Sequence, residues 1–333
     1  MPNEGNLGDL LIAEGTRQFF KRNNIEYTEF DRDQIPERYN LVCAGGARFT
    51  SCWCDEKEAI LSLTDTRIKH CIILPQSIYQ VDSLLEHLDE RHTIICREER
   101  SFHYCVNKCK TSRVILADDL ALQLRLDECE PREMEPPSNE EERKTLRRIE
   151  NGLLKRLSFY TKQASFLGKV NGATKRVAFL MRRDRERVSR LNHPMNYDIT
   201  AQWHTSGRAM AYNSLILHAF KSALCQAYII VSDRLHVCIM AFLCGLEVYM
   251  IDNAYNKLSG VYKLSLKNNP NVHLICGEEL PEDLSIIWRQ SQKPLRILRY
   301  NLISRAFKLG LKFTQLRAAL RRLRSSSSRR YAQ

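Results

Sequence analysis

The sequence has no long hydrophobic run. Its longest apolar stretch, residues 237–246, is ten residues long and stops at Glu247. A bilayer-spanning helix needs about 20 apolar residues, so we expect no transmembrane helix. No export signal is expected either, since the chain opens on the polar and acidic segment 2–6. With 44% hydrophobic residues in a chain of 333, the sequence can nevertheless bury a substantial core.

The cysteines lack the spacing of a metal site. Twelve are present, but none forms a C-x-x-C pair, and the groupings Cys52-x-Cys54 and Cys105-x3-Cys109 have no second pair that would complete a set of ligands. Others, such as Cys238, lie inside apolar segments and are expected to be small buried hydrophobic residues. Because no export signal is visible, we predict free thiols in a reducing cytoplasm and no metal ion.

Acidic residues are missing from the C-terminal part of the chain. Residues 284–333 contain 13 Lys or Arg and no Asp or Glu, whereas residues 1–283 contain 38 basic and 39 acidic side chains. The formal charge of +12 therefore belongs to the C-terminal segment, and the nearly neutral remainder does not indicate nucleic-acid binding.

The basic segment also has a regular apolar pattern. Every third or fourth position is apolar, at Leu295, Leu298, Leu302, Ala306, Leu309, Phe313, Leu316, Leu320 and Leu323. This spacing predicts a basic amphipathic helix in the tail, residues 291–333. Such a helix would either lie on an anionic membrane surface or pack back on the core, and the sequence favours neither.

Short apolar segments alternate with helical patterns through the rest of the chain. Strands are predicted at residues 40–44, 71–74, 93–96, 114–117, 176–181, 227–231, 247–251 and 272–276. Helices are predicted at residues 9–22, 78–88, 142–166, 211–224 and 235–244. Because buried strands alternate with helices, the order predicts an α/β protein with parallel sheets.

A polar, acidic segment divides this pattern in two. We place a first Rossmann-like domain at residues 1–126, an acidic linker at 127–142 and a second Rossmann-like domain at 143–290. Open parallel sheets bind ligands beyond the carboxyl ends of their strands. We therefore expect a central cleft between the two domains, lined by residues that follow the strands.

Two glycine-containing segments could bind an anion. G-N-L-G-D at residues 5–9 precedes a predicted helix, whose free N–H groups can hold an anion, although a capped helix after a turn would explain the same residues. A phosphate loop ordinarily follows a strand and none precedes Gly5, so we expect the first strand of the domain to be missing. The pair Gly45-Gly46 ends a predicted strand, where it permits either close approach to a ligand or a sharp turn.

Polar residues follow three further predicted strands. Gln76 and Ser77 follow the second strand, R-E-E-R-S at residues 97–101 follows the third, and Asp118 and Asp119 follow the fourth. The carboxyl ends of parallel strands lie at one edge of a sheet, so we expect these side chains to line the cleft.

The segment S-D-R-L-H at residues 232–236 lies between a predicted strand and a predicted helix. Ser232 or Asp233 could cap the helix, which would place Arg234 and His236 in its first turn. An arginine beside a helix N-terminus suits a multiply charged anion. His236 is then a candidate general acid or base, although a structural histidine would explain the sequence equally well.

A second basic group, R-R-D-R at residues 182–185, follows the strand predicted at 176–181. It is either a solvated run of charges or an anion clamp. In the second case we expect Arg182 and Arg183 to face Arg234 across the cleft.

In this order, the segments resemble those of the polysaccharide pyruvyl transferase family. The matching segments are G-N-L-G-D at 5–9, A-G-G at 44–46, L-P-Q-S at 74–77, R-E-E-R-S at 97–101, S-D-R-L-H at 232–236 and I-D-N-A-Y-N-K-L-S-G at 251–260. The most specific of them is the Arg-Leu-His element with its following strand and Lys-x-x-Gly. The resemblance implies two Rossmann-like domains in a glycosyltransferase-B-like arrangement.

The resemblance also implies an activity. Members of the family transfer a pyruvyl group from phosphoenolpyruvate onto two hydroxyls of a sugar, which forms a cyclic ketal, and here the acceptor would be a surface polysaccharide or exopolysaccharide precursor. The family associates the Arg-Leu-His element with donor binding and catalysis, which implies these roles for Arg234 and His236. His236 is the expected acid, and Asp9 or Asp118 the expected base.

Phosphoenolpyruvate carries close to three negative charges, so we expect a basic donor site. Arg234 with Arg182 or Arg183 is the expected clamp, and Lys257 is expected to contact the phosphate. The other expected donor-binding residues are Gly5, Asn6, Gly8, Gly45, Gly46, Gln76 and Ser77. No cofactor or metal is expected.

The expected partners are phosphoenolpyruvate and a saccharide acceptor, which could be carried on a lipid, and not nucleic acid. The expected location is the cytoplasm, with the basic tail as a possible contact to the inner face of the membrane. Two alternatives stay open: a nucleotide-sugar-dependent glycosyltransferase of similar architecture, and an inactive membrane-associated scaffold.

Overall fold

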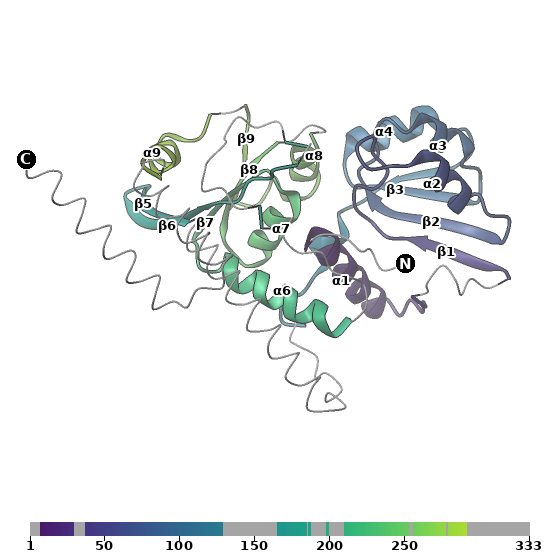
Figure 1. Ribbon diagram of the computed structural model, residues 1–333, viewed down its shortest axis with the longest axis horizontal. Helices are drawn as coiled ribbons and strands as arrows, with labels where there is room; N and C mark the ends of the chain where they lie inside the picture. The colour runs from purple at the N-terminus through teal and green to yellow at the C-terminus, as the bar shows by residue number, and fades with distance from the viewer. Residues whose placement is uncertain are drawn as a thin grey trace, which may run out of the picture.

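The computed structural model describes residues 7–29, 37–128, 165–184, 186–187, 198–199, 210–252, 256–277 and 279–291. These residues form two β-sheets, one of four strands and one of five, each with its strands in sequence order (Figure 1). The prediction of an α/β protein with parallel sheets is confirmed. None of the helices in these ranges is both long and apolar enough to span a membrane.

The first sheet is entirely parallel. Its strands and intervening helices are β1 (Tyr39–Cys43), α2 (Glu56–Leu63), β2 (Ile68–Gln76), α3 (Asp82–His87), β3 (His92–Cys96), α4 (Glu99–Lys108) and β4 (Arg113–Leu116). In Figure 1 the three helices lie on the same face of the sheet. They bury one apolar cluster with it, which includes Ile73, Leu85 and Ile94.

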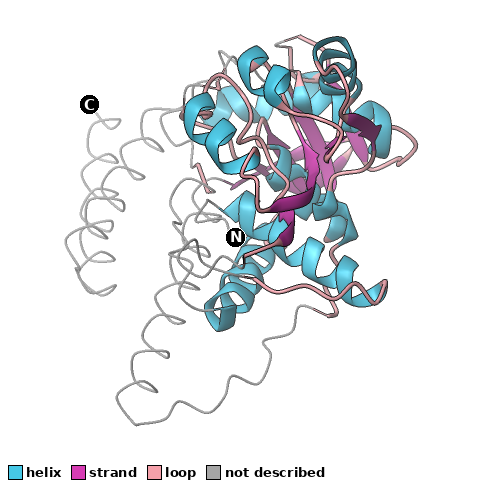
Figure 2. Cartoon of the chain, turned by 90° about the vertical axis from the view of Figure 1, so that its right-hand side faces the viewer, coloured by secondary structure: helices cyan, strands magenta, loops and turns pink. Residues whose placement is uncertain are grey.

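The second sheet is parallel except at its first strand. Its strands are β5 (Ser165–Val170), β6 (Ala173–Phe179), β7 (Ile229–Ser232), β8 (Glu247–Ile251) and β9 (Val272–Ile275). Its helices are α6 (Met210–Leu224), α7 (Leu235–Leu243), α8 (Lys257–Val261), the π-helical turn η3 (Tyr262–Leu266) and α9 (Glu282–Ser291). Figure 2 shows the strands of the protein enclosed by helices.

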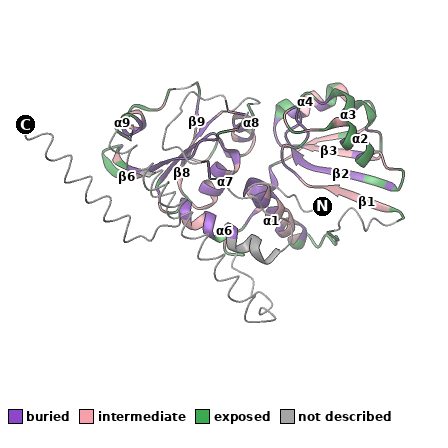
Figure 3. Cartoon of the chain, in the orientation of Figure 1, coloured by how far each residue is buried: buried purple, intermediate pink, exposed green. Residues whose placement is uncertain are grey.

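Strand β6 shows why this sheet is covered on both faces. Successive side chains of a strand point to opposite faces. Val177 and Phe179 belong to the apolar cluster that contains Trp288 of α9, whereas Ala178 belongs to the cluster that contains α6 and α7. Both faces are therefore dry, and β7 is buried along its whole length, which matches the purple in the central part of this sheet in Figure 3.

Helix α1 (Leu7–Arg22) connects the two sheets. Leu11 of α1 shares one buried cluster with Phe220 of α6 and Ala241 of α7. On its other side α1 packs against the 3-10 turn η2 (Leu120–Gln123), since a Cβ added to Gly15 would lie 2.2 Å from the Leu120 carbonyl oxygen. In Figure 1, α1 accordingly lies between the sheets and beside α6.

All eight predicted strands are present, with ends within three residues of the prediction. The helix predicted at 78–88 begins only at Asp82, because Tyr79 still pairs with Thr50 and Gln80 adopts a positive φ of 52°. The prediction missed β5 and wrongly placed residues 165 and 166 at the end of a helix. The signal for β5 was the pair Asn171-Gly172, whose φ angles of 51° and 77° suit a two-residue hairpin turn.

Several predictions fall outside the described residues. These are the segment Gly5-Asn6, nearly all of the linker at 127–142, the rest of the helix at 142–166, and the tail beyond residue 291. The domain limits and the glycosyltransferase-B-like arrangement with its central cleft stay predictions. No disulfide bond joins any cysteine in the described part of the chain.

Candidate active site

Residues that follow the strands of one sheet contact residues that follow the strands of the other. His236, in the first turn of α7, lies 3.4 Å from the Oδ2 atom of Asp119, which follows β4. Trp53, between β1 and α2, donates from its indole nitrogen to Glu186, which follows β6, at 2.5 Å. The first half of the chain (residues 7–128, with the four-stranded sheet) therefore meets the second half (residues 165–291, with the five-stranded sheet) where parallel sheets usually bind ligands.

His236 lies beside a buried ion pair. Asp119 accepts a hydrogen bond from Arg97 Nη1 at 2.7 Å, and both side chains are almost fully buried. His236 Nε2 is 3.5 Å from the same Nη1 atom, while the His236 side chain keeps 15% of its exposure. Burial alone would raise the pKa of Asp119, but Arg97 and the hydrogen-bonding His236 hold it well below its ordinary value. The site therefore keeps a carboxylate beside an accessible imidazole.

Gln76 and Ser77 are buried at the end of β2. The Ser77 hydroxyl accepts from Arg97 Nε at 2.9 Å and donates to Glu98 at 3.1 Å, and Gln76 donates to the Ala44 carbonyl at 3.1 Å. The Gln76 Oε1 atom is buried without a hydrogen-bond partner. Both residues thus hold strand ends together in this structure, and the Gln76 Oε1 atom is left without a partner.

Arg234 is paired with two carboxylates. It precedes α7 and donates to Asp198 at 2.5 and 2.8 Å and to Asp184 at 2.7 Å. The expected cap by Ser232 or Asp233 is absent, because α7 begins at Leu235 and Arg234 itself is the N-cap residue, with no capping bond from its side chain. Ser232 instead accepts from the Arg234 backbone N–H at 3.1 Å.

The Arg182 guanidinium does not face Arg234 across a cleft, contrary to the prediction. The two arginines lie on the same side and share the Asp184 carboxylate, to which Arg182 Nε donates at 2.8 Å. The reason is that they follow β6 and β7, which are adjacent parallel strands and end at the same edge. Arg183 is exposed, and its backbone N–H donates to Asp198.

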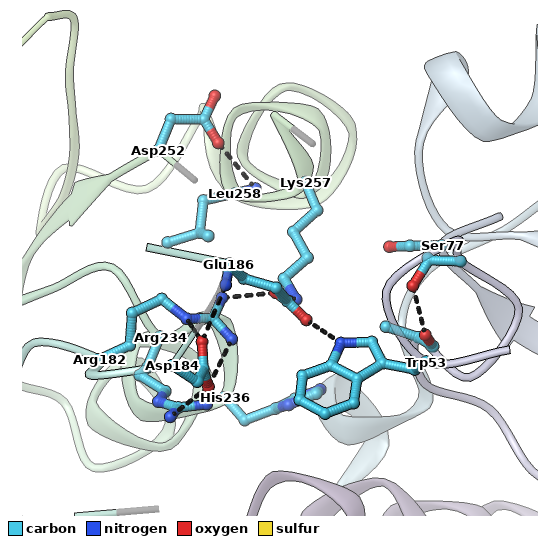
Figure 4. A network of polar contacts seen from close by, with 12 residues as sticks. Trp53, Ser77, Arg182, Asp184, Glu186, Arg234, His236, Asp252, Lys257 and Leu258 are labelled. Carbon is cyan, nitrogen blue, oxygen red and sulfur yellow. Dashed lines mark hydrogen bonds and ion pairs between the residues drawn. The ribbon is translucent and has the colours of Figure 1, made fainter. Parts of the chain in front are cut away.

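Lys257 begins α8 and contacts the same network from above, as Figure 4 shows. Its amine donates to Glu186 Oε2 at 2.5 Å, and Arg182 Nη1 donates to the same oxygen at 2.5 Å. Burial lowers the pKa of Lys257 to about 8, and Arg182 and Arg97 act in the same direction while Glu186 opposes it. Burial would raise the pKa of Glu186, but Lys257 and Arg182 lower it to about 2.

Gly45 and Gly46 are needed because the end of β2 packs closely against their backbone. A Cβ on Gly45 would lie 2.7 Å from the Pro75 carbonyl oxygen, and Gly46 has a φ of 136°. Gly46 exchanges backbone hydrogen bonds with Pro75 and Ser77, which continues the pairing of β1 with β2. Gly8 is buried in α1, and Asp9 Oδ1 lies 3.7 Å from the position of a Cβ on Gly46. Gly5 and Asn6 lie outside the described residues.

Several of these residues were not expected from the sequence. Arg97 and Asp119 were expected at strand ends but without a role, and Trp53, Glu186 and Asp198 were not expected in the site at all. Glu186 follows the noted R-R-D-R segment directly, so an acidic residue there could have signalled an ion-pair network. Trp53 carries no such signal, because its contact with Glu186 spans 133 positions of the chain.

The cations of this network are balanced by carboxylates. Arg97, Arg182, Arg234 and Lys257 each contact at least one Asp or Glu. No three His, Cys, Asp or Glu side chains in the described ranges are grouped so that they could hold a metal ion.

The chain is similar to known proteins over most of its length. A family model described as polysaccharide pyruvyl transferase matches residues 6–255. The Bacillus subtilis (strain 168) protein named "Putative pyruvyl transferase EpsO" is 31% identical over 138 residues, and this match covers 37% of the present chain and 43% of that protein. The matched part is thus less than half of that relative's length.

A solved structure has a similar fold. It is a functionally uncharacterized protein from Klebsiella pneumoniae subsp. pneumoniae NTUH-K2044, which is 23% identical in sequence, with a TM-score of 0.60. The similarity covers 83% of the present chain and 91% of the other. The ordered motifs, the strand-end site and the family match over residues 6–255 lead to one conclusion: the chain belongs to the polysaccharide pyruvyl transferase family.

Proposed function

We propose that this protein transfers a pyruvyl group from phosphoenolpyruvate to two hydroxyls of one sugar in a polysaccharide precursor, forming a cyclic ketal. The observation that carries the proposal is the position of His236. Its partly accessible imidazole lies against the Arg97–Asp119 ion pair and beside a network of two arginines and a lysine. This arrangement combines a proton donor with a binding region for a small anion, within a chain of this family.

The donor would bind where the basic residues converge. Arg182, Arg234 and Lys257 would contact its carboxylate and phosphate, because all three follow strands of the second sheet and share the carboxylates Asp184 and Glu186. Arg183 is exposed beside them and could add a further charge. Gln76 Oε1, buried without a partner, could accept a hydrogen bond from a sugar hydroxyl.

The chemistry requires one protonation and two hydroxyl additions. His236 donates a proton to the methylene carbon of phosphoenolpyruvate, which leaves an oxocarbenium-like centre at the carbon that bears the phosphate. A sugar hydroxyl adds to that carbon and loses its proton. The carbon–oxygen bond to phosphate then breaks, and the second hydroxyl adds and loses its own proton, so that inorganic phosphate and the cyclic ketal are formed. The buried Asp119 carboxylate, 3.4 Å from His236 Nε2, holds the imidazole in position.

Asp9 is our choice for the base that removes a hydroxyl proton. It lies in the first turn of α1, close to Gly46 and therefore to the end of β2. Asp118, the other candidate, is exposed, and its Oδ1 accepts from Ser265 of η3 at 2.6 Å. That contact gives Asp118 a role in joining the two halves.

The test is a reaction with phosphoenolpyruvate and a saccharide acceptor. Phosphate release and the mass of the saccharide are measured for the wild type and for His236→Ala. Pyruvylated product from the wild type and its loss in the variant are the expected results. Phosphate release at an unchanged rate in His236→Ala would contradict the proposed role of His236. Thermal stabilisation by a nucleotide sugar but not by phosphoenolpyruvate would favour a glycosyltransferase instead.

We further propose that the protein works in the cytoplasm on a lipid-linked acceptor, with residues 291–333 held at an anionic membrane surface. The charge pattern of that segment supports the proposal, since it contains no acidic residue. Cosedimentation with anionic vesicles tests it, with a chain ending at residue 291 as the control. Equal binding of both chains, or no binding of the full chain, would contradict it.

A further inference from the structure

Glu186 is the meeting point of three donors from three separate segments. Its Oε2 atom accepts from Lys257 Nζ and from Arg182 Nη1, each at 2.5 Å. Its Oε1 atom accepts from the Trp53 indole nitrogen at 2.5 Å. The Glu186 side chain is only 3% exposed, so these donors enclose the carboxylate almost completely.

The three donors are of the kind that hold an external anion. Two are cationic and the third is a neutral N–H, and together they satisfy both oxygens of a planar carboxylate. Trp53 belongs to the first half of the chain, whereas Arg182 and Lys257 belong to the second. Figure 4 shows the indole reaching toward Glu186 from the lower right, while Lys257 comes from above. Trp53 keeps 46% of its exposure, whereas Arg182 and Lys257 are buried, so of the three donors Trp53 is the one next to solvent.

We propose that Lys257, Arg182 and the Trp53 indole N–H bind an anionic group of the pyruvyl donor, and that the Glu186 carboxylate occupies this anion site in the free protein. When the substrate binds, its carboxylate or phosphate replaces the Glu186 carboxylate on the same three nitrogen atoms. Trp53 is then a contact of the substrate, and Glu186 competes with the substrate for the site. The inference rests on the proposed function for the identity of the anion.

The charge around the site favours such an exchange. Burial, and then the nearby Arg182 and Arg97, lower the pKa of Lys257 to about 8, while Glu186 opposes the shift. Two arginines and a lysine thus lie close to this single carboxylate. An anion that carries more charge than one carboxylate would interact more strongly with the same cations. A phosphate dianion meets this condition, and an uncharged sugar does not.

Binding of inorganic phosphate and of phosphoenolpyruvate tests the proposal, without an acceptor. Calorimetry on the full chain should show that Glu186→Gln binds both anions at least about tenfold more tightly than the wild type, because a like charge has been removed from the site. Glu247→Gln is the matched control. Glu247 also accepts from a lysine, Lys175, at 2.9 Å, but it lies at the start of β8, away from the strand ends, so its variant should bind like the wild type.

Trp53 provides a second readout, which does not depend on how well Glu186→Gln folds. Phosphate should change the tryptophan emission of the wild type, and Trp53→Phe should abolish this change. Equal or weaker anion binding by Glu186→Gln, absence of binding by both proteins, or an emission change that persists in Trp53→Phe would each overturn the inference. If Glu186→Gln binds phosphate tightly but the wild type pyruvylates no acceptor, the anion site is supported and the proposed function is contradicted.

Discussion

His236 Nε2 lies 3.4 Å from Asp119 Oδ2, and the same oxygen accepts from Arg97 Nη1 at 2.7 Å. Asp119 is fully buried, and Arg97 and His236 together hold its pKa well below the ordinary value despite that burial. A fixed negative charge from the first half of the chain therefore meets an imidazole from the second. The residue that we propose as the acid is positioned by the contact between the halves.

Asp119→Asn should lose both stability and activity. It removes the shorter of the two ion pairs of the buried Arg97 and leaves Glu98 at 3.9 Å, and removing one partner of a buried ion pair costs about 3–5 kcal/mol. Chemical denaturation measures this loss. His236→Gln is the comparison, since it keeps the Arg97–Asp119 pair and should change the free energy of unfolding by less than about 1 kcal/mol. Its rate of pyruvyl transfer should still fall by at least about 100-fold. Equal stability of the two variants would contradict this account.

Gly260→Ala should disturb the contact between the two halves. A Cβ at this position would lie 2.5 Å from the Cβ of Glu98, so α8 would have to move away from α4. Overpacking of this kind costs about 1–3 kcal/mol, and the shift of Lys257 should raise the KM for phosphoenolpyruvate. Ser259→Ala, one residue earlier, removes only a hydroxyl bonded to the Asn256 carbonyl, and it should leave both the melting temperature and KM nearly unchanged. A KM for Gly260→Ala that equals the wild-type value would show that α8 tolerates the change.

Asp233 should make stability depend on pH. Burial raises its pKa from 3.8 to about 6, although the Arg182 backbone N–H and nearby cations oppose the shift. The folded state therefore favours the protonated carboxyl. Its contribution is complete below pH 3.8 and is lost as the pH rises through about 6. Relative to Asp233→Asn, the wild type should lose up to about 3 kcal/mol of unfolding free energy between pH 4 and 7. A constant difference between the two proteins over this range would argue against a buried, protonated Asp233.

Asp9→Asn and Asp118→Asn should separate the two candidate bases. Asp9 lies near the end of β2, where the acceptor is expected, so its variant should reduce the rate of transfer by about 100-fold or more. Asp118 is exposed and bonded to Ser265, so its variant should keep most of the activity. Initial rates at saturating phosphoenolpyruvate provide the comparison. A larger loss in Asp118→Asn would reverse the assignment.

Most strands could be predicted because each one is a short apolar run, which can be recognised from neighbouring residues alone. The strands at 93–96 and 247–251 are short runs of apolar residues bounded by polar ones, and the structure has strands within one residue of these limits. Strand β5 was missed because its sequence, S-F-L-G-K-V, carries a weak pattern and its hairpin turn is signalled only by Asn171-Gly172. The packing of α1 against α6 and α7 was also missed, since no local pattern says which distant helix covers an apolar face.

The sequence by itself determined the residue types of the site and their order along the chain. It placed Arg182, Arg234 and His236 after strands, and this followed from the alternation of apolar segments with polar strand ends. Only the tertiary structure decided which charges neutralise which. Arg182 and Arg234 share Asp184 because their strands are adjacent, and Trp53 meets Glu186 because two sheets far apart in sequence come together. Ion pairing depends on distances of a few ångströms between side chains, and no spacing along the chain fixes those distances.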